Sequence, residues 1–411
     1  MQSDSETELE NHVDAVDRAA APALADTGAP PVEVTVVAHD IGSVGGMERQ
    51  LTELLLGLRS MGHEVTVIAR TCELPAHAGV AFHRVRGPGR PFVLAYPWFM
   101  IAGSLALRRR RRGVVQATGA IVLGRVDVIA VHYCHQVGPV NPSRSTWLFR
   151  GHVAVAGMLK RLGERLCFAT ARAVAVVCVS DGVADEVRAH FPRLAPRVLT
   201  IHNGVDADAF APGSRPGEAH AFRSSLQIPG DRLIVAFVGS EWERKGLEHA
   251  IRALGLTPRW VLLVAGSGDQ GRYRALAEEL GVGERVRWLG VSTDVALVYQ
   301  LADAFLLPSS YETFSLVTFE AAASGLPILA TPVSGIRELI DDGQNGFLIE
   351  REPRDIAARL QQLADEPELR ERLGRAARES VLRFSSRRMV AEHHELYARL
   401  AARAATTMPL A

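Results

Sequence analysis

Apolar residues along the chain fall into short strand-like runs separated by stretches with helical spacing. The run VEVTVVAH, which begins at Val32, is rich in β-branched residues, as expected of a strand that is buried on both faces. A glycine-containing loop from Asp40 to Gly46 follows, and apolar residues then recur at helical spacing from Met47 to Met61. The next run, GHEVTVIAR, is again typical of a strand. This order is a βαβ unit, which predicts a parallel sheet covered by helices.

The same order recurs in two series along the chain. VVQAT, DVIAVHY and AVAVVCVS continue the first series, and LIVAFVG, WVLLVAG, RVRWLG, AFLLP and LPILAT form the second. A turn-rich stretch from Asn203 to Pro216 separates the two series. The pattern therefore predicts an α/β chain with two Rossmann-like, doubly wound parallel-sheet domains. We expect them to span residues 31–205 and 206–385, with a last helix at about 386–405 that packs back on the first domain.

The composition fits two globular domains and argues against several function classes. The chain has 411 residues with 46 basic and 46 acidic side chains, so its net charge gives no overall attraction to nucleic acid. Residues 1–30 are acidic, rich in Ala and Pro and without apolar periodicity, which predicts a disordered tail. This N-terminus does not resemble a signal peptide, and the four cysteines have no metal-ligand spacing. Both features favour a protein of the cytoplasm.

One apolar stretch leaves two interpretations open. Residues Pro91 to Leu107 are apolar for 17 positions, contain Pro97, and run directly into five arginines, Arg108 to Arg112. A membrane-spanning helix needs about 20 apolar residues, so this stretch is too short to cross a bilayer. It is either a buried helix that ends in a solvated basic turn, or a surface that docks on an anionic membrane. The second interpretation makes the protein peripheral on the inner face of the membrane.

The segment PSSYETFSLVTFEAAASG, which begins at Pro308, carries the most informative chemistry. Glu312 follows the strand AFLLP, at the strand end where α/β folds bind ligands. We expect a helix to begin near Ser315, so that three amides have no intrahelical partner and can donate to phosphate or sugar oxygens. These amides belong to Phe314, Ser315 and Leu316. Glu320 lies eight residues after Glu312 and is a candidate to accept hydrogen bonds from a ribose diol. In the plainer interpretation, Glu312 only caps the helix and Glu320 is a solvated helix residue.

Lys245 is one of two lysines in the whole chain and follows the strand LIVAFVG after a short loop. Its ammonium can reach a diphosphate at the strand end and stabilise the charge that develops on a leaving phosphate. In the first domain, Gly45 and Gly46 lie in the loop after the first strand, where glycine lets backbone amides approach a phosphate closely.

The motifs, taken in order, resemble the retaining glycosyltransferases of glycosyltransferase family 4. The resemblance runs from about Val32 to about Glu395 through GGMERQ, GHEV, VSDG, NGVDADAF, ERKG, AGSG, RVRWLG, the segment around Glu312, and DGQNGFLI. It implies a GT-B fold, transfer of a hexose-type sugar from a UDP- or GDP-sugar, no metal and no cofactor. It also implies that the second domain provides most of the donor site.

Carried over residue by residue, the resemblance assigns roles to several positions. Glu312 and Glu320 match the family's paired glutamates, of which the first contacts the donor sugar and the second the ribose. His132, at the end of DVIAVHY, lies where the family often has a histidine near the reacting sugar, with His135 as a rival. The backbone around Trp288 in RVRWLG is expected to read the edge of the nucleobase.

One position departs from the family. The arginine that usually follows the glycine of the LIVAFVG strand is replaced here by Ser240. Arg244, beside Lys245, is then the candidate for the second positive charge, as in a subgroup with ERKG-like loops that includes lipopolysaccharide core glucosyltransferases.

We therefore expect the two domains to close over the donor. The hydroxyl of a sugar or lipid-linked acceptor then attacks the donor sugar on the face from which the leaving group departs. No protein nucleophile is evident, so a donor phosphate oxygen would take the acceptor proton. A cell-envelope glycan or glycolipid is the expected product. Three alternatives stay open: a nucleotide-sugar 2-epimerase, a catalytically silent homologue that binds nucleotide sugar, and a membrane-surface scaffold.

Overall fold

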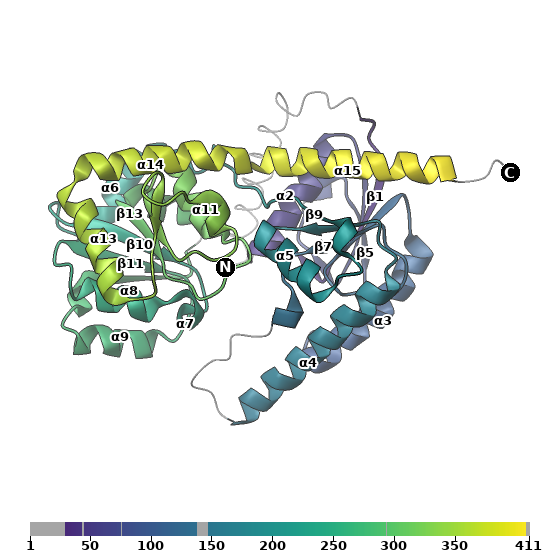
Figure 1. Cartoon of the computed structure of the whole chain (residues 1–411), viewed down its shortest axis with the longest axis horizontal. Helices are drawn as coiled ribbons and strands as arrows, with labels where there is room; N and C mark the ends of the chain where they lie inside the picture. The colour runs from purple at the N-terminus through teal and green to yellow at the C-terminus, as the bar shows by residue number, and fades with distance from the viewer. Residues whose placement is uncertain (1–28, 43–44, 75, 138–146, 293, 408–411) are drawn as a thin grey trace. The chain divides into compact units, whose positions relative to one another are not determined.

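The computed structural model describes residues 29–42, 45–74, 76–137, 147–292 and 294–407, and the chain divides into two compact units (Figure 1). Unit 1 comprises Met1–Gly204 and Ser386–Ala411, and unit 2 comprises Val205–Ser385. Each unit is built on its own parallel sheet, which confirms the predicted two-domain α/β fold. Apart from Ala29 and Pro30, the predicted acidic tail lies outside the described residues.

Unit 1 is built on a seven-stranded sheet in the order β5-β3-β1-β6-β7-β8-β9, with every neighbouring pair parallel. Its strands are β1 (Glu33–Val37), β3 (Glu64–Ala69), β5 (Ala81–Arg84), β6 (Val114–Thr118), β7 (Val128–Val131), β8 (Ala175–Cys178) and β9 (Val198–Thr200). A second, short parallel pair joins β2 (Asp40–Ile41) to β4 (Thr71–Cys72). The segment from Asp40 to Gly46 therefore begins as a strand, so the prediction of an uninterrupted loop there is wrong.

The helices of unit 1 are α2 (Gly46–Ser60), α3 (Phe92–Arg110), α4 (Trp147–Thr170), α5 (Asp181–His190) and α15 (Ser386–Thr407), with the 3-10 turns η1 (Ala76–Ala78), η2 (His135–Val137) and η3 (Ala195–Arg197). Although α15 is the last helix of the chain, it packs against α2. The backbone of α2 at Gly57 leaves room for Val390, since a Cβ at position 57 would lie 2.6 Å from that side chain. Met389, Val390 and Tyr397 are buried in the same core as β1 and β3.

Unit 2 is built on a six-stranded sheet in the order β12-β11-β10-β13-β14-β15, again with parallel neighbours. Its strands are β10 (Leu233–Val238), β11 (Trp260–Ala265), β12 (Val286–Gly290), β13 (Ala304–Leu307), β14 (Ile328–Ala330) and β15 (Gly346–Leu348). Its helices are α6 (Pro216–Ser225), α7 (Trp242–Lys245), α8 (Leu247–Leu254), α9 (Gln270–Glu279), α10 (Val295–Leu301), α11 (Leu316–Ala323), α12 (Ile336–Leu339), α13 (Pro353–Asp365) and α14 (Pro367–Val381), with the 3-10 turns η4 (Gly283–Arg285) and η5 (Leu382–Phe384).

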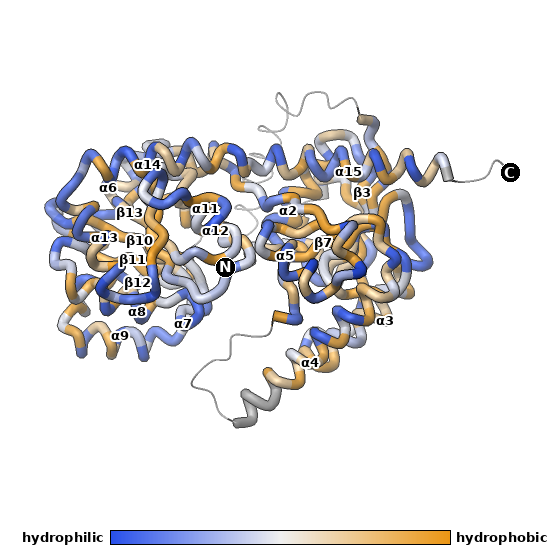
Figure 2. The backbone as a smooth tube through the Cα atoms, viewed as in Figure 1, coloured by the Kyte–Doolittle hydropathy of each residue, from blue (hydrophilic) through white to orange (hydrophobic). Residues whose placement is uncertain are grey.

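Hydrophobic residues are concentrated on the strands of both sheets (Figure 2). β11 is buried along its whole length, from Trp260 to Ala265, as expected of a strand in the interior of a parallel sheet. Such strands read as continuous apolar runs, which is why WVLLVAG could be assigned from the sequence.

The order of strands places the carboxyl ends of particular strands next to each other. In unit 1 the order reverses between β1 and β6, and in unit 2 it reverses between β10 and β13. At such a switch point the connections leave in opposite directions, which opens a crevice outside the carboxyl ends of the two strands. The fold therefore predicts a ligand site beside the loops that follow β10 and β13.

The apolar stretch from Pro91 to Leu107 forms most of α3, and the interpretation as a buried helix holds for one face of it only. Leu94 and Trp98 are 60% and 51% exposed. Pro97 lies inside α3 and does not end it. None of the helices that the structure describes has both the length and the apolar character needed to cross a membrane.

A buried pair of histidines joins α15 to the body of unit 1. His63, which directly precedes β3, is fully buried, and its Nε2 lies 2.7 Å from Nδ1 of His394. Burial, followed by the neighbouring His394, lowers the pKa of His63 to about 4. In the neutral pair, one of these two ring nitrogens donates its proton to the other.

The pH dependence of stability follows from this pKa. The unfolded chain protonates this imidazole below about pH 6.5, whereas the folded chain does so only near about pH 4. Stability is therefore lost as the pH falls between these values, by up to about 1.4 kcal/mol per pH unit from this one residue. We expect His63→Gln to reduce the shift of the urea midpoint between about pH 7 and about pH 5. His77→Gln, at an exposed position of unit 1, is the control; an unchanged shift in His63→Gln would contradict the assignment.

Candidate functional site

Two loops meet at the switch point of unit 2. The first leaves β10 and leads through the single turn α7, which contains Arg244 and Lys245. The second leaves β13 and leads through Glu312 to α11. Because β10 and β13 are neighbouring parallel strands, both loops start at the same edge of the sheet.

The side chains of Lys245, Arg244 and Glu312 converge there. Nζ of Lys245 lies 2.9 Å from Oε1 of Glu312, and a guanidinium nitrogen of Arg244 lies 3.0 Å from the same oxygen. The hydroxyl of Ser309 donates a third hydrogen bond to this oxygen, at 2.9 Å. The structure thus brings together the three unit 2 residues that were predicted to act on the sugar and the diphosphate.

The electrostatics of this cluster keep Glu312 ionised. The carboxyl group is only 7% exposed, and burial alone would raise its pKa. The charges of Lys245 and Arg244, followed by the hydrogen bonds from Lys245 and Ser309, hold the pKa of Glu312 below its usual range. Arg244 also binds Glu241, at 2.8 Å. Two cations therefore face two carboxylates in the ligand-free protein.

Two glycines allow the β10 loop to take this path. The side-chain stem of Lys245 crosses the backbone of Gly239, where a Cβ would lie 2.6 Å from Cε of the lysine. Gly246, directly after α7, has φ 81°, and a Cβ there would lie 2.2 Å from the carbonyl oxygen of Pro308. Glycine is required at position 246 because the loops after β10 and β13 approach each other there at backbone distance, and at position 239 because its φ of 133° is one that other residues rarely adopt.

The start of α11 lies in the second loop, as predicted. Ser315 is its N-cap residue, with φ 73°, and Leu316 is its first helical residue. The positive φ of Ser315 is uncommon for a residue other than glycine. Phe314, just before it, is buried and stacked on Phe319 with ring centroids 4.0 Å apart. Packing of Phe314 therefore fixes the direction in which the first amides of α11 point.

Glu320 lies one turn further into α11 and is 3% exposed. It accepts a hydrogen bond of 3.1 Å from the hydroxyl of Tyr299 on α10. The plainer interpretation of Glu320 as a solvated helix residue is wrong. A carboxylate can accept hydrogen bonds from more than one donor, and a diol presents two.

Ser240 and Trp288 lie near the ends of β10 and β12. The hydroxyl of Ser240 lies 2.8 Å from that of Ser267, in the loop after β11. Trp288 is half-buried and packs against Trp242, with ring centroids 5.5 Å apart. The side chain of Trp288 is thus part of the packing under the loops, and any contact of this segment with a base would come from its backbone.

The predicted residues of unit 1 lie in two places. Gly45, with φ 101°, is the N-cap residue of α2, and Gly46 is the first residue of that helix. His132 follows β7 and lines a cavity of about 20 Å³ together with polar side chains of unit 1. These side chains are Gln50, Gln116, Asn203 and His393.

The pKa of His132 decides what this residue can do. Burial, followed by the nearby His393, lowers it to about 4. The imidazole is therefore neutral near pH 7 and can orient a hydroxyl by hydrogen bonding, but it cannot supply a proton as an imidazolium. The rival His135 lies on η2, where its backbone amide donates to Glu164 at 2.9 Å.

Sequence reasoning missed three polar residues of unit 2. Ser309 and Tyr299 hold Glu312 and Glu320, and Ser267 binds Ser240. Ser309 lies within the segment that was singled out, so its proximity to Glu312 was a usable signal. Tyr299 comes from α10, 21 residues before Glu320, and no local pattern connects them.

Comparison with known proteins agrees with this architecture. Residues 44–209 match the family model described as Glycosyltransferase Family 4, and residues 219–380 match the model described as Glycosyl transferases group 1. An uncharacterized glycosyltransferase of Methanocaldococcus jannaschii is 30% identical over 76% of this chain and 84% of its own length. The D-inositol 3-phosphate glycosyltransferase of Thermomonospora curvata is 31% identical over 82% of this chain and 86% of its own length.

Solved structures show the same fold at lower identity. WaaG, a glycosyltransferase involved in lipopolysaccharide biosynthesis, superposes with a TM-score of 0.74 at 20% identity, over 88% of this chain and 99% of WaaG. HepE of Anabaena in complex with UDP-glucose has a TM-score of 0.65 at 18% identity, over 92% of this chain and all of HepE. With two parallel-sheet units, both family models and relatives matched over more than four fifths of their length, the chain belongs to the family 4 glycosyltransferases with the GT-B fold.

Proposed function

We propose that the protein is a retaining glycosyltransferase that transfers a hexose-type sugar from a UDP- or GDP-sugar to an acceptor hydroxyl, without a metal ion. One observation carries the proposal: Lys245 and Arg244 converge on Glu312 at the switch point of unit 2, at 2.9 and 3.0 Å. Two fixed cations at this place suit a diphosphate, whose charge a divalent metal would otherwise balance. The binding of UDP-glucose by HepE supports a nucleotide-sugar donor.

In this proposal, each residue of the unit 2 site contacts a different part of the donor. In the proposed complex, Lys245 and Arg244 bind the diphosphate together with the amides of the α11 N-terminus, at Phe314, Ser315 and Leu316. Glu312 accepts hydrogen bonds from the donor sugar. Glu320, which Tyr299 already holds in place, binds the ribose diol. The backbone at Trp288 faces the base.

The reaction then proceeds on the donor itself. The acceptor oxygen forms a bond to the anomeric carbon on the face from which the diphosphate leaves, so the configuration is retained. The bond from the anomeric carbon to the phosphate oxygen breaks, and that phosphate takes the acceptor proton. Neutral His132 orients a hydroxyl in this scheme, and Gly45 and Gly46 present backbone amides to the donor.

The acceptor class is proposed from the ERKG loop and from the fold. The ERKG loop resembles that of a subgroup that includes lipopolysaccharide core glucosyltransferases, and WaaG, which has a similar fold, is involved in lipopolysaccharide biosynthesis. We propose a sugar or lipid-linked acceptor of a cell-envelope glycan or glycolipid. The reaction then takes place in the cytoplasm, at the inner face of the membrane.

Nucleotide binding tests the diphosphate site. We expect the wild type to bind UDP, GDP or ADP in calorimetry without divalent metal, with one base preferred. Lys245→Ala should weaken that binding by about 1.5–3 kcal/mol, because one charged hydrogen bond to phosphate is lost. Lys160→Ala changes the other lysine of the chain and should leave the affinity unchanged. A wild type that binds none of the three nucleotides would overturn the proposed function.

Substitution of Glu312 distinguishes an effect on nucleotide binding from an effect on sugar transfer. In the ligand-free protein its charge neutralises Lys245 and Arg244, so Glu312→Gln should bind the preferred nucleoside diphosphate at least as tightly as the wild type does. Because the proposed contact with the sugar is weakened, release of nucleotide from the nucleotide sugar in the presence of acceptor should fall by about a hundredfold. Glu241→Gln removes the other carboxylate that binds Arg244 and serves as the matched control.

A catalytically silent, nucleotide-sugar-binding homologue is the second candidate. It is favoured by Ser240, whose hydroxyl binds Ser267 where the family usually has an arginine. This candidate would be favoured if the rate of acceptor-dependent nucleotide release by the wild type were within a few-fold of the rate for the Glu312→Gln variant.

A further inference from the structure

Unit 1 carries an exposed apolar stripe on α3. Leu94, Trp98, Ile101 and Leu105 follow one another at intervals of four, three and four residues and are 60%, 51%, 60% and 47% exposed. The buried residues of α3, such as Tyr96, Phe99 and Gly103, lie on the opposite side of the helix. The stripe therefore faces away from the core; within unit 1, the indole N–H of Trp98 donates a hydrogen bond of 3.0 Å to the carbonyl of Arg86, and the aliphatic residues of the stripe are among the exposed ones.

A second stripe of the same kind lies on α4. Val155, Met158, Leu162 and Leu166 are 46%, 55%, 51% and 46% exposed. The two helices pack against each other: Nζ of Lys160 on α4 lies 4.9 Å from the ring centroid of Phe92 on α3. Of the 14 large hydrophobic side chains that are exposed in the described ranges, eight belong to these two stripes. Scattered exposed leucines need no explanation, but this concentration does.

The same part of the sequence has an unusual charge. Residues 74–180 contain 15 lysines and arginines and two acidic residues, whereas the whole chain has 46 of each kind. The two acidic residues offset little of this charge. Asp127 binds Arg111 at 3.0 Å, and Glu164 is 1% exposed and accepts hydrogen bonds inside unit 1.

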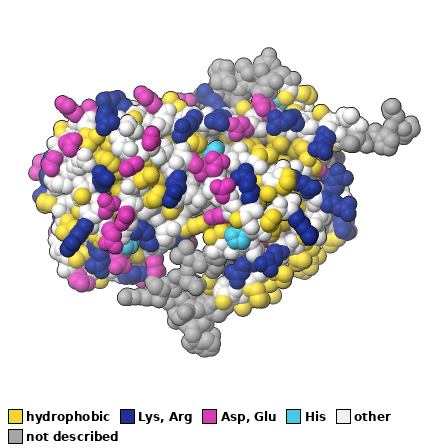
Figure 3. Space-filling model, in the orientation of Figure 1, with side chains coloured by type: hydrophobic (Ala, Val, Ile, Leu, Met, Phe, Trp, Pro, Cys, Tyr) yellow, Lys and Arg dark blue, Asp and Glu magenta, His cyan; other side chains and the backbone are white. Residues whose placement is uncertain are grey.

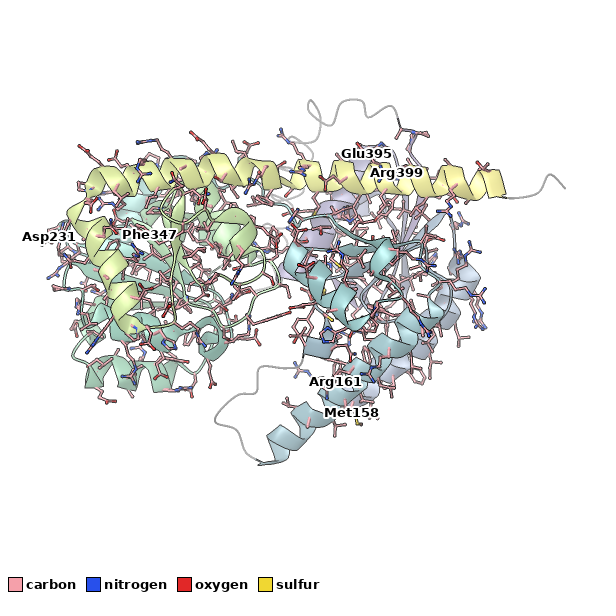
Figure 4. The ribbon with its side chains drawn as sticks, in the orientation of Figure 1. Met158, Arg161, Asp231, Phe347, Glu395 and Arg399 are labelled. Carbon is pink, nitrogen blue, oxygen red and sulfur yellow. The ribbon has the colours of Figure 1, made fainter. Side chains whose placement is uncertain are left out.

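The basic side chains lie beside the apolar ones. Arg108, Arg109 and Arg110 are exposed at the end of α3, and Arg165 is exposed on α4. Figure 3 shows hydrophobic side chains along the lower right edge of unit 1, where α3 and α4 lie, with lysines and arginines next to them. Figure 4 marks Met158 and Arg161 on α4 at the lower edge of the view.

We propose that the face formed by the two stripes and the neighbouring arginines, which we term the α3–α4 face, docks unit 1 in the plane of an anionic lipid bilayer. The apolar stripes enter the boundary between headgroups and acyl chains, and the arginines bind lipid phosphates. Docking in the plane agrees with the lack of a membrane-crossing helix among the described residues. The inference deepens the membrane location in the proposed function by naming its surface, and it does not depend on sugar transfer.

Charge decides between a bilayer and a second copy of the chain. In a dimer formed through the α3–α4 face, two strongly basic surfaces would be brought together, and like charges at close range oppose association. An anionic bilayer satisfies the arginines and the apolar stripes at once. Of the two occupants, only the bilayer complements both properties of the face.

Cosedimentation of the full chain with vesicles tests the proposal. We expect the wild type to pellet with vesicles that contain phosphatidylglycerol and to stay in solution with pure phosphatidylcholine. Leu94→Gln with Ile101→Gln keeps every charge and should reduce binding by about tenfold or more, because two of the most exposed side chains of the α3 stripe become polar. Arg108→Gln, Arg109→Gln and Arg110→Gln together keep the stripes and should reduce binding by a similar factor. The last variant spares Arg111, which Asp127 holds.

The controls separate docking from folding and from the proposed reaction. Leu256→Gln changes a 55% exposed leucine of unit 2 and should bind vesicles as the wild type does. All variants should keep the calorimetric affinity for nucleotide. Nucleotide binding without vesicle binding would overturn the docking alone, and vesicle binding without nucleotide binding would overturn the proposed function alone. A wild-type dimer in gel filtration that Leu94→Gln with Ile101→Gln dissociates would assign the face to a second copy instead.

Discussion

Glu312 is an ionised carboxylate in a place that water hardly reaches, with 7% of the residue exposed. A charge in such a place is stable only if opposite charges and donors surround it, because the loss of hydration costs several kcal/mol for an ion of this kind. Lys245, Arg244 and Ser309 provide that compensation at hydrogen-bond distance. The loops after β10 and β13 are therefore tied to each other across 67 positions of sequence.

Unusual backbone conformations on both loops allow the contact between Lys245 and Glu312. Gly239 leaves room for the stem of Lys245, and Gly246 lets α7 end against the carbonyl of Pro308. On the other loop, Ser315 takes a positive φ so that α11 can begin immediately after Glu312. Uncommon backbone conformations are tolerated where the surroundings determine them, and such places are often functional.

The two units use charge in different ways. In unit 2 the cations Lys245 and Arg244 are balanced one by one by carboxylates, which fixes their positions before a ligand arrives. In unit 1 the basic residues of positions 74–180 outnumber the acidic ones 15 to two, and Arg108, Arg109 and Arg110 are exposed at the end of the α3 stripe. Paired charges give a precise site for a small anion, whereas unpaired charges beside apolar surface suit an extended anionic partner.

The sequence by itself determined the parallel α/β fold, because short apolar runs rich in β-branched residues alternate with longer stretches of helical spacing, and this order is that of βαβ units. It also pointed to Glu312 and Lys245, because each follows a strand and its loop, and to Arg244 through the resemblance of the ERKG loop. The tertiary structure decided what no local pattern contains: that β10 and β13 are neighbours, that Tyr299 holds Glu320, and that α3 and α4 leave their apolar stripes exposed. Periodicity shows that a helix has an apolar face, but whether another element covers that face depends on contacts between segments far apart in the chain.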